Sequence, residues 1–224
     1  MNKGAIADSG YWIEEPVLSP TECAAITSAL HSSNRSRAGI RHLMTNPAVC
    51  AVASDRRLVA IAQKALGPQA VPFRATLFEK SGQANWLVAW HQDTALPLAS
   101  SFEASGWGPW SLKVGILYAH APASVLSRIV ALRLHLDMST SENGPLRVVP
   151  GSHAAGVLTD GEVFEYVRRQ DYIECLVEQG GVLAMRPLVI HSSSKARSTD
   201  PRRVLHIEYA GSLELGPGVR LAIA

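Results

Sequence analysis

The chain has 224 residues, of which 47% are hydrophobic and 18% are charged, which is typical of a folded globular protein and not of a disordered one. A formal net charge of +2 is too small to indicate nucleic acid binding. The adjacent basic pairs are also scattered rather than gathered in one segment. These pairs are Arg56/Arg57, Arg168/Arg169 and Arg202/Arg203. We expect one domain over residues 1–224 that binds no nucleic acid.

Cysteine usage fits a reducing compartment, and hydropathy predicts no membrane span. The three cysteines are far apart and odd in number, and they form no C-x-x-C motif, which argues against a disulfide framework. They are Cys23, Cys50 and Cys175. No apolar run reaches the roughly 18 residues expected of a membrane span, and "MNKGAIADSGYW" lacks the apolar stretch of a signal peptide. We expect a soluble cytoplasmic protein with no membrane partner; the oligomeric state, monomer or homodimer, cannot be inferred.

Residues 1–70 are expected to form a mainly helical support region. "YWIEEPVL" (11–18) is typical of a short strand, and "SPTECAAITSAL" (19–30) predicts a helix. Ser19 is the expected N-cap of that helix, and Glu22 completes a capping box with it. A second helical region is expected from about residue 47 to residue 66.

From residue 71 onward, alternating apolar residues and turn signals predict a series of strands. The expected strands are "PFRATLFEK" (72–80), "NWLVAWHQD" (85–93), "RIVALRLHLDM" (128–138), "PLRVVPG" (145–151), "DYIECLVEQ" (171–179), "GVLAMRPLVIH" (181–191) and "RVLHIEYAG" (203–211). "GEVFEYVRRQ" (161–170) interrupts them as a short helix. Helices followed by antiparallel strands predict a mainly β, α+β protein, and a jelly-roll core over residues 71–212 suits this number of strands.

A long segment, residues 94–127, also interrupts the strands. It is rich in Gly, Ser and Pro and too long for a hairpin loop, and such loops are usually functional or disordered. We expect a lid over a binding site. Trp107 and Trp110 either close over an apolar substrate or pin the segment to the core.

Two H-x-D motifs, His91/Asp93 and His135/Asp137, offer an imidazole and a carboxylate on one face of a strand. Both motifs end a strand, so periodicity does not separate them. Asp137 runs into the turn "STSENGP", where Asp commonly caps the backbone, whereas Asp93 opens onto residues 94–127. This context favours His91/Asp93 as a metal-binding pair over the alternative that they merely end a strand.

A third ligand would complete the two-His-one-carboxylate arrangement of non-haem iron(II) oxygenases. His191 is a candidate, since it ends a predicted strand and is followed by a Ser/Lys/Arg loop. Arg202 follows eleven residues later, and its guanidinium could bind the distal carboxylate of a dicarboxylate cosubstrate. Taken singly, His191 could be an ordinary polar residue and Arg202 a surface charge; their joint order and spacing strengthen the interpretation.

Four segments of the sequence resemble the phytanoyl-CoA dioxygenase family of iron(II)/2-oxoglutarate oxygenases. They are "GYWIEEPVLSPTEC", "WHQD", "ENGPLRVVPGSHAAGVL" and "HSSSKARSTDPRRVLHIEY". The third is highly specific for this family, and the resemblance covers nearly the whole chain. It implies a double-stranded β-helix (cupin-like jelly roll), and an enzyme that uses Fe(II), 2-oxoglutarate and O₂ and releases succinate and CO₂.

The resemblance also implies roles for individual residues. His91, Asp93 and His191 match the iron ligands, which are the catalytic residues, and the carboxylate ligand Asp93 indicates hydroxylation or a related oxidation rather than halogenation. Arg202 matches the arginine that binds 2-oxoglutarate, with Arg203 as the alternative one residue on. The further cosubstrate-binding candidates are Ser193, Thr76, Arg133 and Arg37; at Arg133 relatives often carry an aromatic residue, so its role is open. His153, His135 and Asp137 are expected to be structural.

The substrate is expected to be a small metabolite, because nothing in the sequence demands a CoA thioester. Whether the reaction is hydroxylation, desaturation or ring formation is open. Two other classes are possible: a non-catalytic jelly-roll protein that binds a metal or ligand, and a zinc hydrolase. Neither explains Arg202, and no Glu stands beside the ligands as a general base for a hydrolase.

Overall fold

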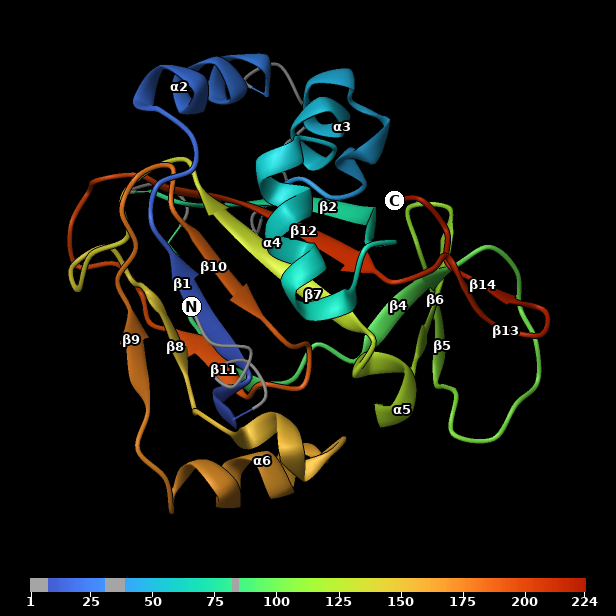
Figure 1. Ribbon diagram of the computed structural model, residues 1–224. Helices are drawn as coiled ribbons and strands as arrows, with labels where there is room; N and C mark the ends of the chain where they lie inside the picture. Colours follow the sequence, from blue (N-terminus) through green and yellow to red (C-terminus); the bar gives the residue numbers. More distant parts are fainter. Residues whose placement is uncertain (1–7, 31–38, 82–84) are drawn as a thin grey trace.

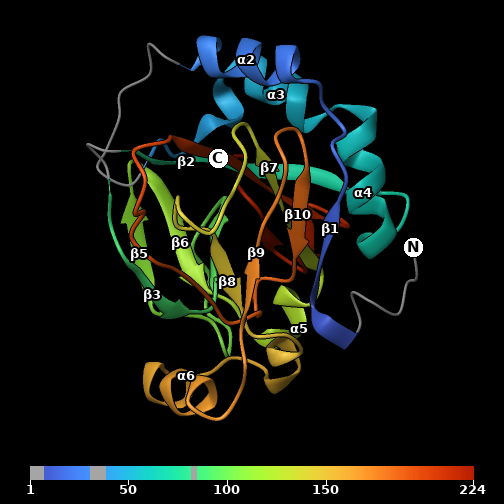
Figure 2. The same cartoon turned by 90° about the vertical axis from the view of Figure 1, so that its left-hand side faces the viewer.

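The computed structural model describes residues 8–30, 39–81 and 85–224. Its core is a pair of antiparallel sheets facing each other, as the strand pattern predicts, with helices on the outside (Figures 1 and 2). Among the described residues, no helix is both long and apolar enough to cross a lipid bilayer.

The larger sheet has five strands and carries the helices on its outer face. In spatial order its strands are β1 (Tyr11–Glu14), β10 (Val182–Met185), β7 (Ile129–His135), β12 (Arg202–Ala210) and β2 (Val71–Lys80). Alternation divides β12 between the two faces: Leu205 and Ile207 join the apolar core beneath the helices, whereas His206 and Glu208 face the other sheet. Polar side chains therefore gather between the sheets.

The smaller sheet has four strands and closes the sandwich. Its order is β3 (Val88–His91), β11 (His191–Ser193), β8 (Leu146–Val148) and β9 (Ile173–Cys175). One half of the space between the sheets is apolar and includes Leu146, Val148, Leu183 and Met185. The other half is the polar region that contains the candidate site.

The N-terminal helices pack along the outer face of the larger sheet, as expected. They are α2 (Pro20–Ala29), η1 (Leu43–Thr45), α3 (Pro47–Ala53) and α4 (Arg56–Leu66). In Figure 1, α2 and α3 lie above this sheet, and α4 lies across it, against β7. The predicted capping box of α2 is present: Glu22 N donates to Ser19 Oγ and Ser19 N donates to the Glu22 carboxylate. The helix α6 (Asp160–Val167) packs near β3 below the smaller sheet.

Residues 94–127, expected to be a long loop that forms a lid, contain a third sheet, so the expectation of a loop was wrong and the lid stays a prediction. Its strands are β4 (Ala95–Leu98), β6 (Ile116–His120) and β5 (Trp110–Lys113), in that order, and α5 (Ala123–Leu126) follows them. Trp107 and Trp110 pack edge-on against Phe102, with ring centroids 5.0 and 5.2 Å away, and join a second apolar core. These contacts favour the alternative in which the two tryptophans fix the segment to the core.

The hairpin between β5 and β6 turns through Val114 and Gly115, both with positive φ (50° and 80°). Tight hairpin turns need positive φ at both central residues, and Asn-Gly is the usual pair. Val-Gly gives no such signal, which is why the strand pattern missed this hairpin.

We expect Val114→Asn to stabilise the protein, because a β-branched residue is strained at positive φ. The left-handed conformation costs roughly 1–2 kcal/mol for an ordinary residue, so relief of about 1 kcal/mol should raise Tm by ~2–4 °C. Thermal unfolding followed by circular dichroism measures this change. Leu112→Asn, at a similarly exposed position on β5, should give no gain; an unchanged Tm in Val114→Asn would show that the turn is not strained.

Two smaller differences concern the end of the chain. Residues 181–191 are not one strand, because β10 ends at Met185 and β11 begins at His191; Pro187 lies in the turn between them and cannot donate to a strand ladder. After β12, β13 (Glu214–Gly216) and β14 (Val219–Arg220) form a small hairpin. Ala224 then pairs by backbone hydrogen bonds with β2, beyond the expected limit of the core at residue 212.

Candidate active site

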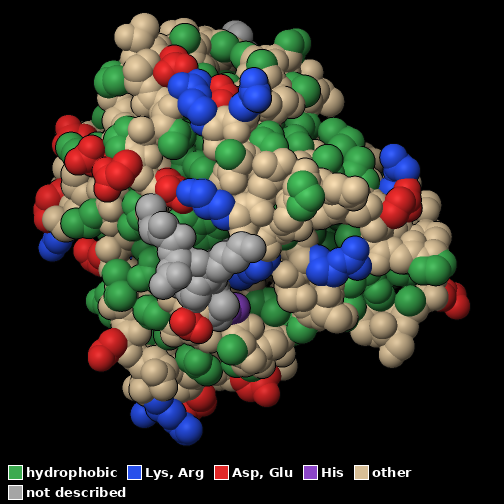
Figure 3. Space-filling view, viewed as in Figure 1, with side chains coloured by type: hydrophobic (Ala, Val, Ile, Leu, Met, Phe, Trp, Pro, Cys, Tyr) green, Lys and Arg blue, Asp and Glu red, His purple; other side chains and the backbone are tan. Residues whose placement is uncertain are grey.

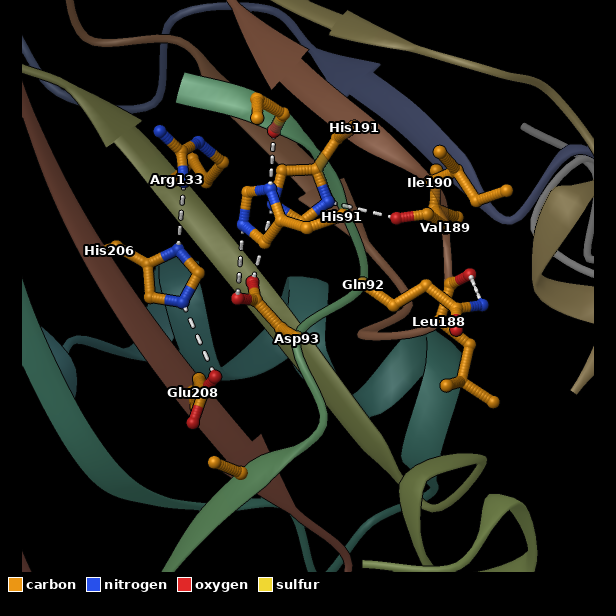
Figure 4. Close-up of polar contacts among 12 residues, drawn as sticks. His91, Gln92, Asp93, Arg133, Leu188, Val189, Ile190, His191, His206 and Glu208 are labelled. Carbon is orange, nitrogen blue, oxygen red and sulfur yellow. Dashed lines mark hydrogen bonds and ion pairs between the residues drawn. The ribbon is translucent and has the colours of Figure 1, made fainter. Parts of the chain in front are cut away.

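The three predicted metal ligands converge between the two sheets. His91 ends β3, Asp93 follows two residues later, and His191 begins β11, which pairs with β3 so that His191 lies opposite His91. Asp93 Oδ1 is 3.7 Å from His91 Nε2, and Asp93 Oδ2 is 3.5 Å from His191 Nε2. The two rings and the carboxylate point toward one another (Figure 4). Across the described parts of the chain, they are the one group of three such side chains close enough to hold a metal ion.

Backbone hydrogen bonds orient both imidazoles for metal binding. His91 Nδ1 donates to the carbonyl of Ala89 and His191 Nδ1 donates to that of Val189, each over 2.8 Å. Because Nδ1 is the donor in both rings, Nε2 is the atom left to bind a metal ion, and in each ring it lies toward Asp93. Metal-binding histidines usually have this second hydrogen bond, which fixes the tautomer and ring direction.

The charge states also suit a metal ion. Burial lowers the pKa of His191 to about 3, helped by the neighbouring His91, so this imidazole is neutral at physiological pH. Burial alone would raise the pKa of Asp93, but the nearby imidazoles and Arg74 outweigh it and hold the pKa well below its usual range. Two imidazoles and one carboxylate are the donor set that divalent iron binds in oxygenases.

Gln92 lies between His91 and Asp93 in the sequence, and its side chain binds the backbone of neighbouring loops. Its Nε2 donates to the carbonyls of Gly156 and Leu188, both at 2.8 Å, and its Oε1 accepts from Leu158 N at 2.8 Å. The amide thus holds the end of β3 to two loops, and it fixes the direction in which His91 and Asp93 leave the strand.

A cavity of about 80 Å³ adjoins the three ligands on one side. Its polar wall includes Arg202 and Ser193, both predicted to bind a cosubstrate. Arg202 is 3% exposed; its Nε donates to Asn143 O at 3.2 Å and its Nη2 to Ser193 Oγ at 3.3 Å. Among the described residues, nothing pairs with the buried Arg202 Nη1, and a buried guanidinium nitrogen without a partner is costly. An anion in the cavity would pair with it.

Lys80, which the sequence reasoning missed, lines the same cavity. It ends β2 and is 2% exposed, and its Nζ donates to Ser193 Oγ at 2.7 Å and to the carbonyl of Ser194. Burial, together with the positive charges of Arg202, Arg147 and Arg133, lowers its pKa to about 7. A signal was available, because alternation along β2 places Lys80 on the same face as Thr76.

Arg133, whose role was open, joins a buried network on the inner face of the larger sheet. Its Nη1 donates to His206 Nδ1 at 3.1 Å, so His206 carries its proton on Nε2, which lies 3.3 Å from Glu208 Oε1. Glu208 also pairs with Arg74. Figure 4 shows His206 between Arg133 and Glu208 beside the three ligands. Arg133 lines the 80 Å³ cavity.

The remaining candidates are placed differently. Thr76 lines a second, larger cavity that also touches Asp93, and its role in cosubstrate binding stays a prediction. Arg37 lies outside the described residues. Trp107 and Trp110 are not among the residues that line either cavity.

Arg203 and the second H-x-D motif form a separate ion pair. Arg203 Nε lies 2.7 Å from Asp137 Oδ2, and Arg203 Nη2 lies 2.7 Å from Asp137 Oδ1. The Arg203 guanidinium is therefore not available to the cavity. Asp137 was expected to cap the following turn, but its carboxylate binds this distant arginine instead; Asn143 Oδ1 accepts from Thr140 N in that turn. His135 is fully buried nearby on β7.

His153 lies against the N-terminal segment rather than near the ligands. A side chain at Gly10, whose φ is +79°, would meet His153 Nδ1 at 2.4 Å, and Gly151 N donates to Ser9 O. The "PGSH" segment therefore packs against the chain just before β1, in agreement with the structural role expected of His153.

Comparison with known proteins agrees with this geometry. The chain matches the phytanoyl-CoA dioxygenase (PhyH) family over residues 6–204. It is 28% identical over 178 residues to L-proline trans-4-hydroxylase of Streptomyces griseoviridis, covering 68% of this chain and 59% of the relative, and so spans less than two thirds of that protein. Its fold is similar to AviO1 of Streptomyces viridochromogenes Tue57 (TM-score 0.67, 22% identity, 93% and 92% of the two chains). It is also similar to EctD of S. alaskensis with 2-oxoglutarate and 5-hydroxyectoine (TM-score 0.69, 19% identity, 93% and 74%). The chain belongs to the phytanoyl-CoA dioxygenase family.

Proposed function

We propose that the protein is an iron(II)- and 2-oxoglutarate-dependent dioxygenase, one oxygenase domain that oxidises a C–H bond of a small metabolite and releases succinate and CO₂. Hydroxylation is the reaction we favour. The observation that carries the proposal is the position of His91, Asp93 and His191 beside a buried cavity that contains Arg202. Family membership supports it, and so does the similarity to a hydroxylase of L-proline.

His91, Asp93 and His191 would hold iron(II) through the two Nε2 atoms and the carboxylate. When bound, iron(II) with 2-oxoglutarate supplies the redox chemistry that activates O₂. The chain's own part is to hold these ligands in fixed tautomers and to keep water from the reacting groups. Phe78, Trp86 and Val88, which line the 80 Å³ cavity, supply apolar surface for the second purpose.

The 80 Å³ cavity suits the distal carboxylate of 2-oxoglutarate. Arg202 offers its free Nη1 and Lys80 an ammonium group. The Ser193 hydroxyl donates to Gly144 O at 2.9 Å and accepts from both cations, so it holds them beside the cavity. A carboxylate held by a guanidinium and a second cation receives charge-assisted hydrogen bonds, which are about twice as strong as neutral ones. Neither a non-catalytic binder nor a zinc hydrolase would need this group of cations beside the metal ligands.

We expect 2-oxoglutarate binding at pH 8 to take up roughly one proton at Lys80. In the protein without cosubstrate the pKa of Lys80 is about 7, so most of its amine is neutral at pH 8. A bound carboxylate favours the ammonium form and raises the pKa of Lys80. At a pH between the pKa of the free protein and that of the complex, binding is therefore accompanied by protonation of Lys80. Calorimetric titrations in buffers of different ionisation enthalpy measure the uptake.

Lys80→Met should lose this proton uptake, and Lys195→Met, at an exposed position after β11, should keep it. A binding enthalpy that does not depend on the buffer in the wild type would contradict the role given to Lys80.

Succinate formation tests the proposed function. The protein supplied with iron(II), 2-oxoglutarate, O₂ and a mixture of small metabolites should form succinate, and the same protein loaded with zinc should form none, because zinc has no redox chemistry. Equal succinate formation with either metal, or none with iron, would overturn the proposal.

A further inference from the structure

A second cavity, of about 240 Å³, lies beside the proposed metal site. Phe78 and Asp93 line both this cavity and the smaller one, so a molecule in the larger cavity would lie next to the metal ligands. Thr94 and Ala95 at the start of the third sheet, with Lys113, Tyr118 and His120, form one wall. The third sheet, formed by the segment that was expected to be a lid, therefore borders the site.

Three cations line this larger cavity, and among the described residues two of them have no carboxylate partner. Arg74 is neutralised: it pairs with Glu208 and donates to Ala95 O at 2.9 Å. In the described part of the chain, neither Arg41 nor Lys113 makes an ion pair with a carboxylate. Asp93, the one carboxylate in the wall, is assigned to the metal. Arg41 is exposed and Lys113 is half-buried, so the described part of the cavity wall carries two positive charges with no carboxylate partner.

Arg41 and Lys113 are held near each other by different parts of the fold. Ile40 forms a two-way backbone bridge with Leu77 on β2, which places Arg41 beside that strand. Lys113 ends β5, and its Nζ lies 4.8 Å from the centre of the Tyr118 ring. Burial lowers the pKa of Lys113, and the charges of Arg41 and Arg74 lower it further. This mutual repulsion is a cost that a bound anion would relieve.

The rest of the wall suits a small polar molecule. The cavity is smaller than the roughly 300–1,000 Å³ of pockets for drug-sized ligands, so the part of a substrate that lies inside it is small. Tyr118 OH lies 3.0 Å from His42 Nε2 and Thr94 Oγ1 lies 2.7 Å from His120 Nδ1, so these hydroxyl groups have fixed directions. On the face drawn in Figure 3, several Lys and Arg side chains lie near the middle and others at the edge, whereas most Asp and Glu side chains lie toward the edge.

We propose that the substrate is a small molecule with an anionic group, a carboxylate or a phosphate, which Arg41 and Lys113 bind while the C–H bond to be oxidised lies at the Asp93 end of the cavity. This inference rests on the proposed function. Arg41 and Lys113 then set substrate specificity, and the third sheet serves to carry Lys113 and Tyr118 to the site.

Anion binding to the protein loaded with zinc and saturated with 2-oxoglutarate tests this inference, because the cosubstrate then fills the Arg202 cavity. The probes are isobutyrate, its neutral isostere isobutyramide, and inorganic phosphate, each titrated by calorimetry. We expect at least one anion to bind and isobutyramide not to bind; the tighter anion distinguishes a carboxylate from a phosphate. The dissociation constant should rise at least tenfold in Arg41→Gln/Lys113→Gln.

The matched control is Arg56→Gln/Arg169→Gln, which removes the same charge from positions on α4 and just after α6 that line neither cavity; it should bind anions as the wild type does. Lys113→Gln alone provides a second variant if the double variant unfolds. Absence of anion binding to the wild type, equal binding of isobutyramide, or unchanged binding in the variants would overturn the inference. Binding of 2-oxoglutarate is measured in the same samples, so its failure would refute the proposed function separately.

Discussion

Replacing His191 by Ala is expected to abolish iron binding and, with it, succinate formation. His191 is one of three protein ligands, and its Nε2 is fixed toward Asp93 by the hydrogen bond to Val189. Loss of a residue that hydrogen-bonds to a metal ligand typically lowers metal affinity or activity about 10- to 100-fold. Loss of a ligand itself should therefore lower the affinity for iron further. Equilibrium dialysis of iron(II) under anaerobic conditions measures the affinity.

His135→Ala is the matched control for this experiment. His135 is also a buried histidine on a core strand and belongs to the second H-x-D motif, so the substitution removes the same side-chain volume. It should destabilise the protein without changing the affinity for iron. If both variants lost iron equally, the loss would reflect damage to the core, and His191 would not be assigned as a ligand.

Replacing Arg202 by Gln is expected to weaken 2-oxoglutarate binding about 10- to 100-fold while leaving iron binding intact. Hydrogen bonds to charged groups contribute about 1.5–3 kcal/mol each, and 1.4 kcal/mol corresponds to a tenfold change in affinity. Gln retains some hydrogen bonding but removes the charge. Calorimetric titration of the metal-loaded protein with 2-oxoglutarate gives the dissociation constant.

Arg203→Gln distinguishes the two adjacent arginines. In the wild type, the Arg203 guanidinium binds Asp137 and does not reach the cavity. Arg203→Gln should therefore bind 2-oxoglutarate normally and lose only stability. A larger loss of affinity in Arg203→Gln than in Arg202→Gln would reverse the assignment.

Much of the site could be predicted from the sequence because strand alternation is local. It places His91 and Asp93 on one side of the chain, and the spacing from His191 to Arg202 follows one strand and one loop. The position of Lys80 was equally accessible, since it shares a face of β2 with Thr76. It was overlooked because a lysine at the end of a strand is usually a solvent-exposed charge.

Other features depend on contacts between distant residues. The ion pair between Asp137 and Arg203 joins positions 66 residues apart, and nothing near Asp137 distinguishes that pair from a turn cap. The third sheet was missed because its hairpin turns through Val114 and Gly115 rather than Asn-Gly. That Arg41 and Lys113 line one cavity, with no carboxylate partner among the described residues, is evident only from the fold, which brings these distant positions together.

The most direct test of the central claim is the visible spectrum of the anaerobic protein with iron(II) and 2-oxoglutarate. Chelation of iron by the cosubstrate predicts a weak charge-transfer band that is absent in His191→Ala, much weaker in Arg202→Gln and unchanged in Arg203→Gln. A protein that binds iron(II) but shows no band when 2-oxoglutarate is added would contradict the assignment of this site.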